Sequence, residues 1–259
     1  VASANAANRE LYYIGVSGDG DTASIGLGQF CHAVRRRLNM AYIVMNNGCY
    51  GLTKGQFSAT NDKTSPSKKG EANPFEAIDL CQMAIQLGAG FVARSFSGDK
   101  SQLIPLIKAA ISYNGFALLD VVSPCVTFNN HPASTKSYDY VRAHNMASEN
   151  HLDYVEPKEE ITVDFAEGTT ADIELHDGSR LLLSKLGAQH DPRDADAALM
   201  TIRANAAKGV VTTGLLHIDQ SERDMHDILA TDARPLNALP MSELCPGSKA
   251  LDAINARLA

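Results

Sequence analysis

The chain has 259 residues, of which 44% are hydrophobic, and this length and composition predict a folded globular protein rather than a disordered one. Its formal net charge is −7, from 30 acidic and 23 basic residues, so it lacks the excess of Lys and Arg typical of a nucleic-acid-binding surface. The longest apolar run, MAYIVM at 40–45, is far shorter than the roughly 20 residues of a membrane-spanning helix. The opening VASANAANRE has neither the basic nor the apolar region of a signal peptide. We expect a cytoplasmic protein with neither nucleic acid nor membrane as a partner.

The first half of the chain alternates short β-rich runs with longer helix-compatible segments. This alternation predicts a doubly wound α/β domain, in which helices cover both faces of a parallel sheet. Short, nearly continuous apolar runs predict buried parallel strands at 11–16, 41–46, 91–94 and 116–122. Helices are predicted at 22–38, 74–87 and 100–112, the second because it opens with Pro74 and is followed by Gly88.

A long Gly, Lys, Ser and Thr-rich stretch, residues 47–73, follows the second predicted strand. Loops of this length in a compact domain usually carry function or are disordered, and open α/β sheets bind ligands beyond the carboxyl ends of their strands. We therefore expect the functional site in this loop.

The pattern changes after residue 125. A polar, irregular segment at 128–150 precedes three runs, 160–165, 170–175 and 180–183, that predict a small antiparallel meander, with H-D-G-S as the hairpin signal. A helix at 194–208, a strand at 212–218 and a polar tail complete the chain. We divide it into an α/β domain at 1–130, a linker at 131–158 and a C-terminal α+β extension at 159–259, packed on the first domain or on a partner.

The turn I-G-V-S-G-D-G-D connects the first predicted strand to the first helix. It fits a loose dinucleotide-binding fingerprint, but the second strand ends in Asn46-Asn47 and not in the acidic residue that binds ribose in nicotinamide sites. A carboxylate at Asp19 would repel a diphosphate unless a cation lay between them, and a carboxylate with a carboxamide such as Asn47 suits Mg²⁺. The alternative is an ordinary strand–turn–helix in which Asp19 caps the helix and Asn46-Asn47 forms a turn.

Two motifs carry a family resemblance. G-D-G followed after 25 residues by N-N resembles the diphosphate-binding motif of thiamine diphosphate enzymes. The run N-N-G-C-Y-G-L-T-K-G-Q, followed by S-A-T, resembles the signature of the β subunit of 2-oxoacid:ferredoxin oxidoreductases, as do S-G-D-G-D and the later S-P-C-V-T-F-N. The resemblance spans about residues 1–130, and the C-terminal extension is similar to bacterial members usually assigned to 2-oxoglutarate.

The resemblance implies a thiamine diphosphate-binding fold with a defined metal site. Mg²⁺ would be held by the Asp19 carboxylate, the Asn47 side-chain oxygen and the Cys49 backbone carbonyl, with N–H groups near residues 21–23 donating to the diphosphate. Lys54, the candidate catalytic residue, would pair with a substrate carboxylate or a coenzyme A phosphate, or else be a solvated loop residue. The other cofactor-binding residues would be Gly18, Gly20, Asp21, Tyr50, Gly51, Leu52 and Thr53.

The resemblance implies oxidative decarboxylation of a 2-oxoacid with transfer of the acyl group to coenzyme A. The expected substrate of this chain is 2-oxoglutarate, which would give CO₂ and succinyl-CoA. Electrons would pass through a [4Fe-4S] cluster to ferredoxin, and the thiamine cofactor would carry the difficult chemistry. The implied partners are the α subunit of the same enzyme, ferredoxin, coenzyme A and the 2-oxoacid. Three alternatives stay open: the same reaction on pyruvate, a thiamine-dependent decarboxylase or synthase without iron–sulfur chemistry, and a non-catalytic assembly subunit.

The cysteines depart from the family's pattern. Cys125 matches its isolated late cluster ligand, but the five cysteines include no C-x-x-C pair, and the N-terminal C-P-G-C-type segment of the family is absent from this sequence. One thiolate cannot hold a [4Fe-4S] cluster, which needs four ligands. We therefore expect a piece of a longer subunit, the remaining cluster ligands outside this chain as given, and the glutamate that activates the aminopyrimidine in a partner subunit.

Overall fold

The computed structural model describes residues 11–51, 53, 55–63, 65, 72–123, 161–175, 180–221, 223–232, 234, 236–245 and 247–258. The expectations for Leu52, Lys54 and Cys125, the linker and both expected domain boundaries lie outside these residues. Within them, no helix is both long and apolar enough to cross a membrane.

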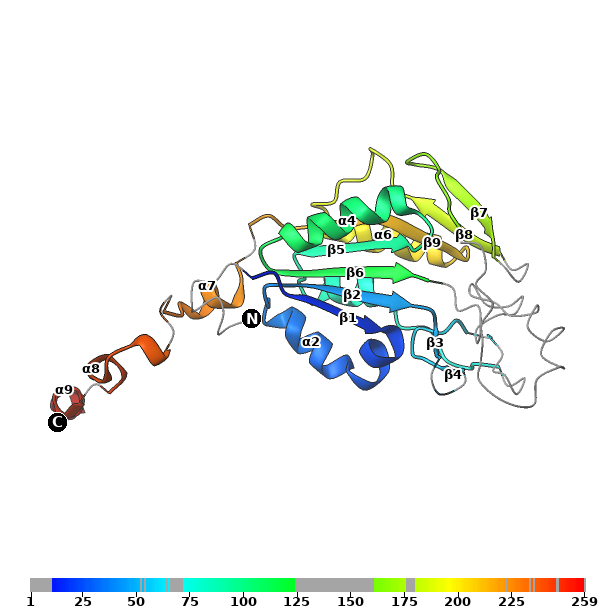
Figure 1. The fold of residues 1–259 in the computed structure, drawn as a ribbon. Coiled ribbons are helices and arrows are strands. Elements are labelled where there is room, and N and C mark those ends of the chain that lie inside the picture. Colours follow the sequence, from blue (N-terminus) through cyan, green and yellow to red (C-terminus); the bar gives the residue numbers. More distant parts are fainter. Residues whose placement is uncertain are drawn as a thin grey trace.

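A seven-stranded, mostly parallel sheet forms the centre of the molecule (Figure 1). Four parallel strands follow the order β1 (Ile14–Gly18), β2 (Met40–Asn46), β6 (Phe116–Val122) and β5 (Phe91–Phe96). The antiparallel strand β9 (Val210–Ile218) pairs with β5, and the sheet continues through β8 (Arg180–Lys185) to β7 (Thr170–Glu174). The predicted α/β class is confirmed, and the C-terminal extension adds its strands to the same sheet.

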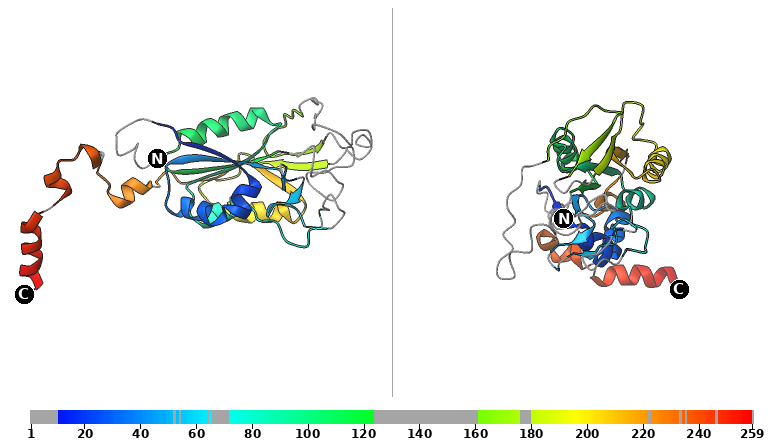
Figure 2. Two further views of the ribbon diagram at one scale, coloured as in Figure 1. Left: turned by 60° about the horizontal axis from the view of Figure 1, so that its bottom comes forward. Right: turned by 90° about the vertical axis from the view of Figure 1, so that its right-hand side faces the viewer.

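Helices pack against both faces of the sheet, as Figure 2 shows. On one face α4 (Lys100–Ser112) packs against an apolar cluster that includes Phe91 and Leu119. On the other, α2 (Leu27–Arg35), α3 (Leu80–Gln86) and α6 (Ala195–Ala206) bury Val44, Val92 and Leu118. Because both faces are covered, every residue of β5 and β6 is buried, which explains why most of their residues are apolar.

The helix expected at 22–38 is wrong in its bounds. The segment opens as a π-helix, η1 (Gly20–Ile25), and continues as α2, which ends at Arg35 before Arg37 adopts a left-handed conformation with φ of 52°. The two helical segments meet at Gly26, where a Cβ would lie 2.6 Å from the Asp21 carbonyl oxygen. A glycine is therefore needed at this junction.

The helix expected at 74–87 begins only at Leu80. The carboxylate of Asp79 caps it by accepting a hydrogen bond of 2.9 Å from the backbone N–H of Gln82. Pro74 instead lies in a turn in which the Asn73 side-chain oxygen accepts from the N–H of Phe75 at 3.1 Å.

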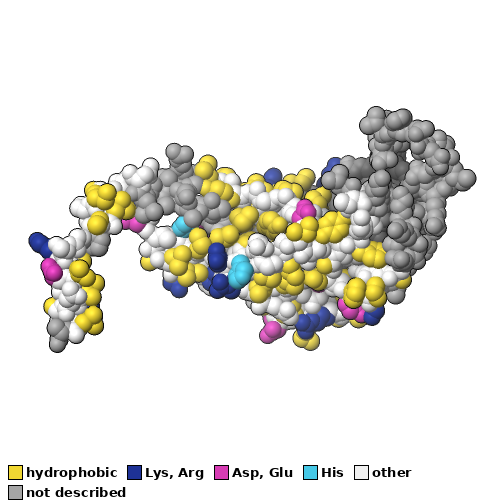
Figure 3. Space-filling view, turned by 90° about the horizontal axis from the view of Figure 1, so that it is seen from below, with side chains coloured by type: hydrophobic (Ala, Val, Ile, Leu, Met, Phe, Trp, Pro, Cys, Tyr) yellow, Lys and Arg dark blue, Asp and Glu magenta, His cyan; other side chains and the backbone are white. Residues whose placement is uncertain are grey.

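The C-terminal predictions are correct in part. β7 and β8 pair antiparallel as expected, and Asp194 caps α6 where a helix was predicted. The strand expected at 160–165 is wrong, because residues 161–165 form no ladder; the N–H of Val163 donates instead to the Gly98 carbonyl at 3.0 Å. The polar tail, for which no helix was predicted, carries α7 (Met225–Leu229), η3 (Leu236–Ala238), α8 (Met241–Leu244) and α9 (Gly247–Leu258). These project from the body, and hydrophobic side chains are exposed along them (Figure 3).

The loop after β2 folds into a small hairpin of β3 (Cys49–Tyr50) and β4 (Gln56–Phe57). Gly48 and Gly55 adopt positive φ angles of 76° and 89°, which an L-residue rarely tolerates. The N–H of Ser58 donates to the Gly48 carbonyl at 3.2 Å and closes the hairpin at its base. The hairpin thus returns the chain to the carboxyl end of β2.

Candidate functional site

The carboxyl ends of β1 and β2 lie side by side, with Gly18 aligned opposite Met45. Asp19 directly follows β1, and Asn47 directly follows β2. The backbone N–H of Asn47 donates to Asp19 Oδ1 at 3.3 Å. The parallel register therefore brings together the two residues that the sequence singled out as metal ligands.

The Asp19 side chain does not cap the helix that follows it. The residue has a helical conformation (φ −66°, ψ −36°), and its side chain makes no capping hydrogen bond to η1. Although Asp19 is only 1% exposed, its Oδ2 accepts hydrogen bonds from the hydroxyl groups of Ser58 and Thr60, the latter at 2.5 Å. This geometry excludes the capping alternative and leaves a buried carboxylate oriented by other groups.

Asn46 and Asn47 have different surroundings. The side-chain oxygen of Asn47 accepts from the N–H of Cys49 at 3.1 Å, which fixes the carboxamide over the start of β3. Asn46 points into the protein, where its Nδ2 donates to Asp120 Oδ1 at 3.1 Å and its Oδ1 lies 3.1 Å from the Thr60 hydroxyl. Asn47 is thus the carboxamide at the site, while Asn46 connects the site to the interior of the sheet.

Tyr50 packs directly on the glycine-rich turn. Its hydroxyl donates to the Gly20 carbonyl at 2.9 Å, and a Cβ on Gly20 would lie 2.5 Å from the tyrosine ring. The position needs glycine for this contact, whereas a Cβ on Gly18 would make only an ordinary contact of 3.6 Å with the Asp21 carboxylate. Tyr50 therefore holds the turn against the hairpin.

The other predicted cofactor-binding residues are less enclosed. Asp21 and Thr53 are exposed, and the Thr53 hydroxyl donates to the side-chain oxygen of Gln56. Gly51 begins the turn of the hairpin, whose backbone is closed by the N–H of Gly55 donating to the Tyr50 carbonyl at 2.8 Å.

A buried ion-pair network lies behind the site. Arg94 Nε donates to Asp120 Oδ2 at 2.7 Å, and its Nη2 donates to Asp79 Oδ1 at 2.8 Å. Burial alone would lower the pKa of Arg94, but the two carboxylates more than offset it and hold that pKa well above its usual value. Burial would likewise raise the pKa of Asp79, yet the guanidinium keeps it below its usual value. Burial also raises the pKa of the Cys81 thiol, whose Sγ lies 3.8 Å from Asp120.

The sequence analysis missed this network and the two hydroxyls on Asp19. A signal was present, because Arg94 and Asp120 each interrupt a continuous apolar strand, and β5 and β6 place them directly opposite one another. Ser58 and Thr60 belong to the S-A-T segment of the family signature, but sequence spacing alone gave no reason to place them on Asp19.

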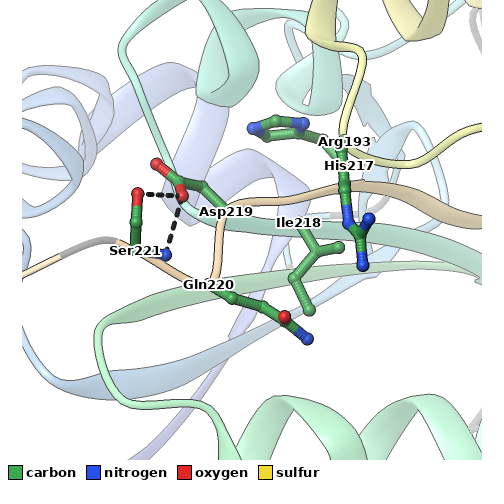
Figure 4. A pocket seen from close by; sticks show the side chains of 6 residues that line it. All are labelled: Arg193, His217, Ile218, Asp219, Gln220 and Ser221. Atoms are coloured by element: carbon green, nitrogen blue, oxygen red, sulfur yellow. Dashed lines mark hydrogen bonds between the residues drawn. The ribbon is translucent and has the colours of Figure 1, made fainter.

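The donor groups at this edge of the sheet suit a magnesium ion that is shared with a ligand. Among the described residues, no group of three or more His, Cys, Asp or Glu side chains could hold a metal by itself. Asp19, Asn47 and nearby backbone carbonyls offer oxygen atoms, which Mg²⁺ prefers and completes with phosphate or water oxygens. A separate shallow cleft, lined by residues that include Arg193 and His217, lies at the opposite end of the sheet and contains no predicted site residue (Figure 4).

Residues 1–121 match the family described as "Thiamine pyrophosphate enzyme, C-terminal TPP binding domain". This part of the chain contains the strands β1 and β2, whose carboxyl ends bring Asp19 and Asn47 together. More narrowly, about half of the chain is similar, at about 40% identity, to the β subunits of 2-oxoacid:ferredoxin oxidoreductases.

Three relatives illustrate the similarity to 2-oxoacid:ferredoxin oxidoreductases. The chain is 40% identical over 157 residues to the "2-oxoacid:ferredoxin oxidoreductase subunit beta" of Saccharolobus solfataricus, a match that covers 60% of this chain and 50% of that one. It is 40% identical over 126 residues to the "2-oxoglutarate synthase subunit KorB" of Methanocaldococcus jannaschii, covering 47% and 46%. A solved 2-oxoglutarate:ferredoxin oxidoreductase from Magnetococcus marinus, with 2-oxoglutarate, coenzyme A and succinyl-CoA bound, superposes with a TM-score of 0.60 at 28% identity, covering 82% of this chain and 58% of that one. The chain spans about half the length of the curated relatives it matches.

Proposed function

We propose that the protein binds thiamine diphosphate and Mg²⁺ at the carboxyl edge of β1 and β2, as part of the β subunit of a 2-oxoacid:ferredoxin oxidoreductase. The observation that carries this proposal is the buried Asp19 carboxylate, which is held against Asn47 and does not cap its helix. The reaction would be the oxidative decarboxylation of 2-oxoglutarate to succinyl-CoA and CO₂, with electrons passed to ferredoxin. The names and bound ligands of the relatives support this reaction.

In this proposal the chain positions the cofactor. Asp19, the Asn47 side-chain oxygen and the Cys49 carbonyl would hold Mg²⁺, which would neutralise the repulsion between the carboxylate and the diphosphate. Gly18, Gly20 and the first residues of η1 would lie along the diphosphate, held in place by Tyr50. Bound thiamine diphosphate supplies the carbon nucleophile and electron sink that decarboxylation of a 2-oxoacid requires.

The choice of 2-oxoacid is the finer part of the proposal. The second carboxylate of 2-oxoglutarate needs a partner that pyruvate does not, and Lys54 is the candidate in this chain. Loss of a charge-assisted hydrogen bond costs about 1.5–3 kcal/mol, or about ten- to a hundredfold. Lys54→Met should raise KM for 2-oxoglutarate by that factor and change KM for pyruvate far less; equal losses would place Lys54 at the cofactor or at coenzyme A.

Electron transfer is proposed to involve Cys125 as one ligand of a [4Fe-4S] cluster whose other ligands lie outside this chain. Cys125→Ser in the complete complex should lower the iron content and ferredoxin reduction, while 2-oxoacid-dependent CO₂ release in a single turnover persists, because thiamine diphosphate carries that step. Full iron content in the variant would show that Cys125 is not a ligand.

The proposed reaction is tested with the protein assembled with its α subunit. We expect reduction of ferredoxin that depends on both 2-oxoglutarate and coenzyme A and yields succinyl-CoA. Decarboxylation without ferredoxin reduction would favour a thiamine-dependent decarboxylase or synthase. Assembly with no thiamine diphosphate bound would favour a non-catalytic subunit.

A further inference from the structure

The two oxygens of the Asp19 carboxylate have unequal surroundings. Oδ2 lies against the hydroxyls of Ser58 and Thr60, whereas Oδ1 receives the N–H of Asn47 at the longer distance of 3.3 Å. Each carboxylate oxygen offers about two acceptor sites. The two hydroxyls therefore occupy Oδ2 fully, and Oδ1 keeps a lone pair for another partner.

Each hydroxyl has a single proton, so its direction can be worked out. Ser58 Oγ accepts from the N–H of Thr60 at 3.2 Å, and its own proton can go to Asp19 Oδ2 or to the Thr60 hydroxyl, of which Asp19 Oδ2 is the nearer. The Thr60 proton has three possible acceptors, Asp19 Oδ2 at 2.5 Å, Ser58 Oγ at 2.9 Å and Asn46 Oδ1 at 3.1 Å. The carboxylate is both nearer and charged, and charged acceptors form the stronger hydrogen bonds. Both protons are thus directed to the same carboxylate oxygen.

The two hydroxyls are fixed in place by the fold around them. Ser58 and Thr60 are each 4% exposed. The backbone between them is held on both sides, because the N–H of Ala59 donates to the Ser24 hydroxyl at 3.0 Å and its carbonyl accepts from the N–H of Ile78 at 2.7 Å. The backbone therefore holds both side chains beside Asp19.

We propose that Ser58 and Thr60 are positioning residues that limit Asp19 to coordination through Oδ1 alone and thereby favour Mg²⁺ over Ca²⁺. This proposal rests on the proposed function, in which Asp19 holds the metal. Mg²⁺ demands six ligands at about 2.0–2.1 Å, whereas Ca²⁺ takes 6–8 at about 2.3–2.6 Å and often binds a carboxylate through both oxygens. An Asp19 whose Oδ2 is already occupied offers the arrangement that suits the smaller ion.

The test compares metal selectivity with thiamine diphosphate as the probe, in the full-length protein freed of cofactor. Calorimetry gives the concentrations of Mg²⁺ and of Ca²⁺ that produce half-maximal thiamine diphosphate binding, and their ratio measures selectivity. The variants are Thr60→Val, Thr60→Ser and the double variant Ser58→Ala/Thr60→Val. Thr213→Val is the matched control, because Thr213 is a fully buried threonine in β9 whose hydroxyl has no hydrogen-bond partner among the residues that the structure describes.

We expect the double variant to lower the preference for Mg²⁺ over Ca²⁺ about tenfold, and Thr60→Val to lower it in the same direction. Thr60→Ser keeps the hydroxyl and should retain the wild-type ratio, as should Thr213→Val. The proposal is overturned if the ratio stays within about twofold of wild type in both Thr60→Val and the double variant. If the double variant does not fold, Thr60→Val alone decides. An equal weakening of binding with both ions also overturns the proposal, because it would indicate a structural role. Asp19→Ala distinguishes failure of this proposal from failure of the proposed function. Metal-dependent thiamine diphosphate binding that survives in that variant contradicts the proposed function itself.

Discussion

Replacing Arg94 tests whether the buried network behind the site stabilises the fold. The Arg94 side chain is 9% exposed and is the cation between Asp79 and the fully buried Asp120. Arg94→Met removes that cation and leaves an uncompensated buried carboxylate, which typically costs about 3–5 kcal/mol. At about 2–4 °C per kcal/mol for a chain of this size, Tm should fall by about 6–20 °C.

The assay is thermal and urea unfolding followed by circular dichroism, with the double variant Arg94→Met/Asp120→Asn as control. An amide at position 120 removes the orphaned charge and can still accept from Asn46, so the double variant should recover part of the lost stability. An Arg94→Met protein within about 1 kcal/mol of wild type, or a double variant less stable than the single one, would refute this reasoning.

Three further predictions concern other charged and glycine positions. The folded-state pKa of Asp79 lies below its usual value, so the stabilisation by its ionised carboxylate is complete above about pH 4 and is lost as pH falls through the folded pKa. As pH is lowered from 6 to about 2.5, the urea midpoint of unfolding should therefore fall less steeply in Asp79→Asn than in wild type. The ammonium of Lys185 contacts the Asp99 carboxylate at 2.6 Å in a buried ion pair, so Lys185→Met leaves a buried carboxylate without its cation. This should lower the free energy of unfolding by about 3–5 kcal/mol and speed amide hydrogen exchange in β8. Unchanged exchange in β8 would contradict this prediction. Gly20→Ala forces a Cβ against the Tyr50 ring and should weaken thiamine diphosphate binding, an effect that Tyr50→Leu should relieve in the double variant.

Much of the fold could be predicted because its central strands, β5 and β6, are buried on both faces. The observed β6 (Phe116–Val122) and α4 (Lys100–Ser112) have the predicted bounds, since a nearly continuous apolar run and a capped amphipathic segment leave few alternatives. The start of α3 was missed because Pro74 suggested a helix start, whereas the Asp79 carboxylate decides where it begins. The π-helix at Gly20–Ile25 carries no sequence signal of its own.

The site could be predicted only in part. The parallel register makes Asp19 and Asn47 neighbours once their strands are recognised, so their proximity follows from sequence. Ser58 and Thr60 reach Asp19 only because the β3–β4 hairpin folds back, and that depends on two glycines with positive φ angles. Such tertiary contacts between residues about 40 positions apart have no local pattern from which to be inferred.

The most direct measurement of the central claim is calorimetric titration of the protein with thiamine diphosphate, with and without Mg²⁺, in wild type and in Asp19→Ala. The fold should tolerate the substitution, because the hydroxyls of Ser58 and Thr60 lie 2.9 Å apart and can bond to each other, and an unchanged circular dichroism spectrum checks this. The account predicts binding by wild type that requires Mg²⁺, and no detectable binding by the folded variant. Binding of equal affinity without Mg²⁺, or in Asp19→Ala, would contradict it.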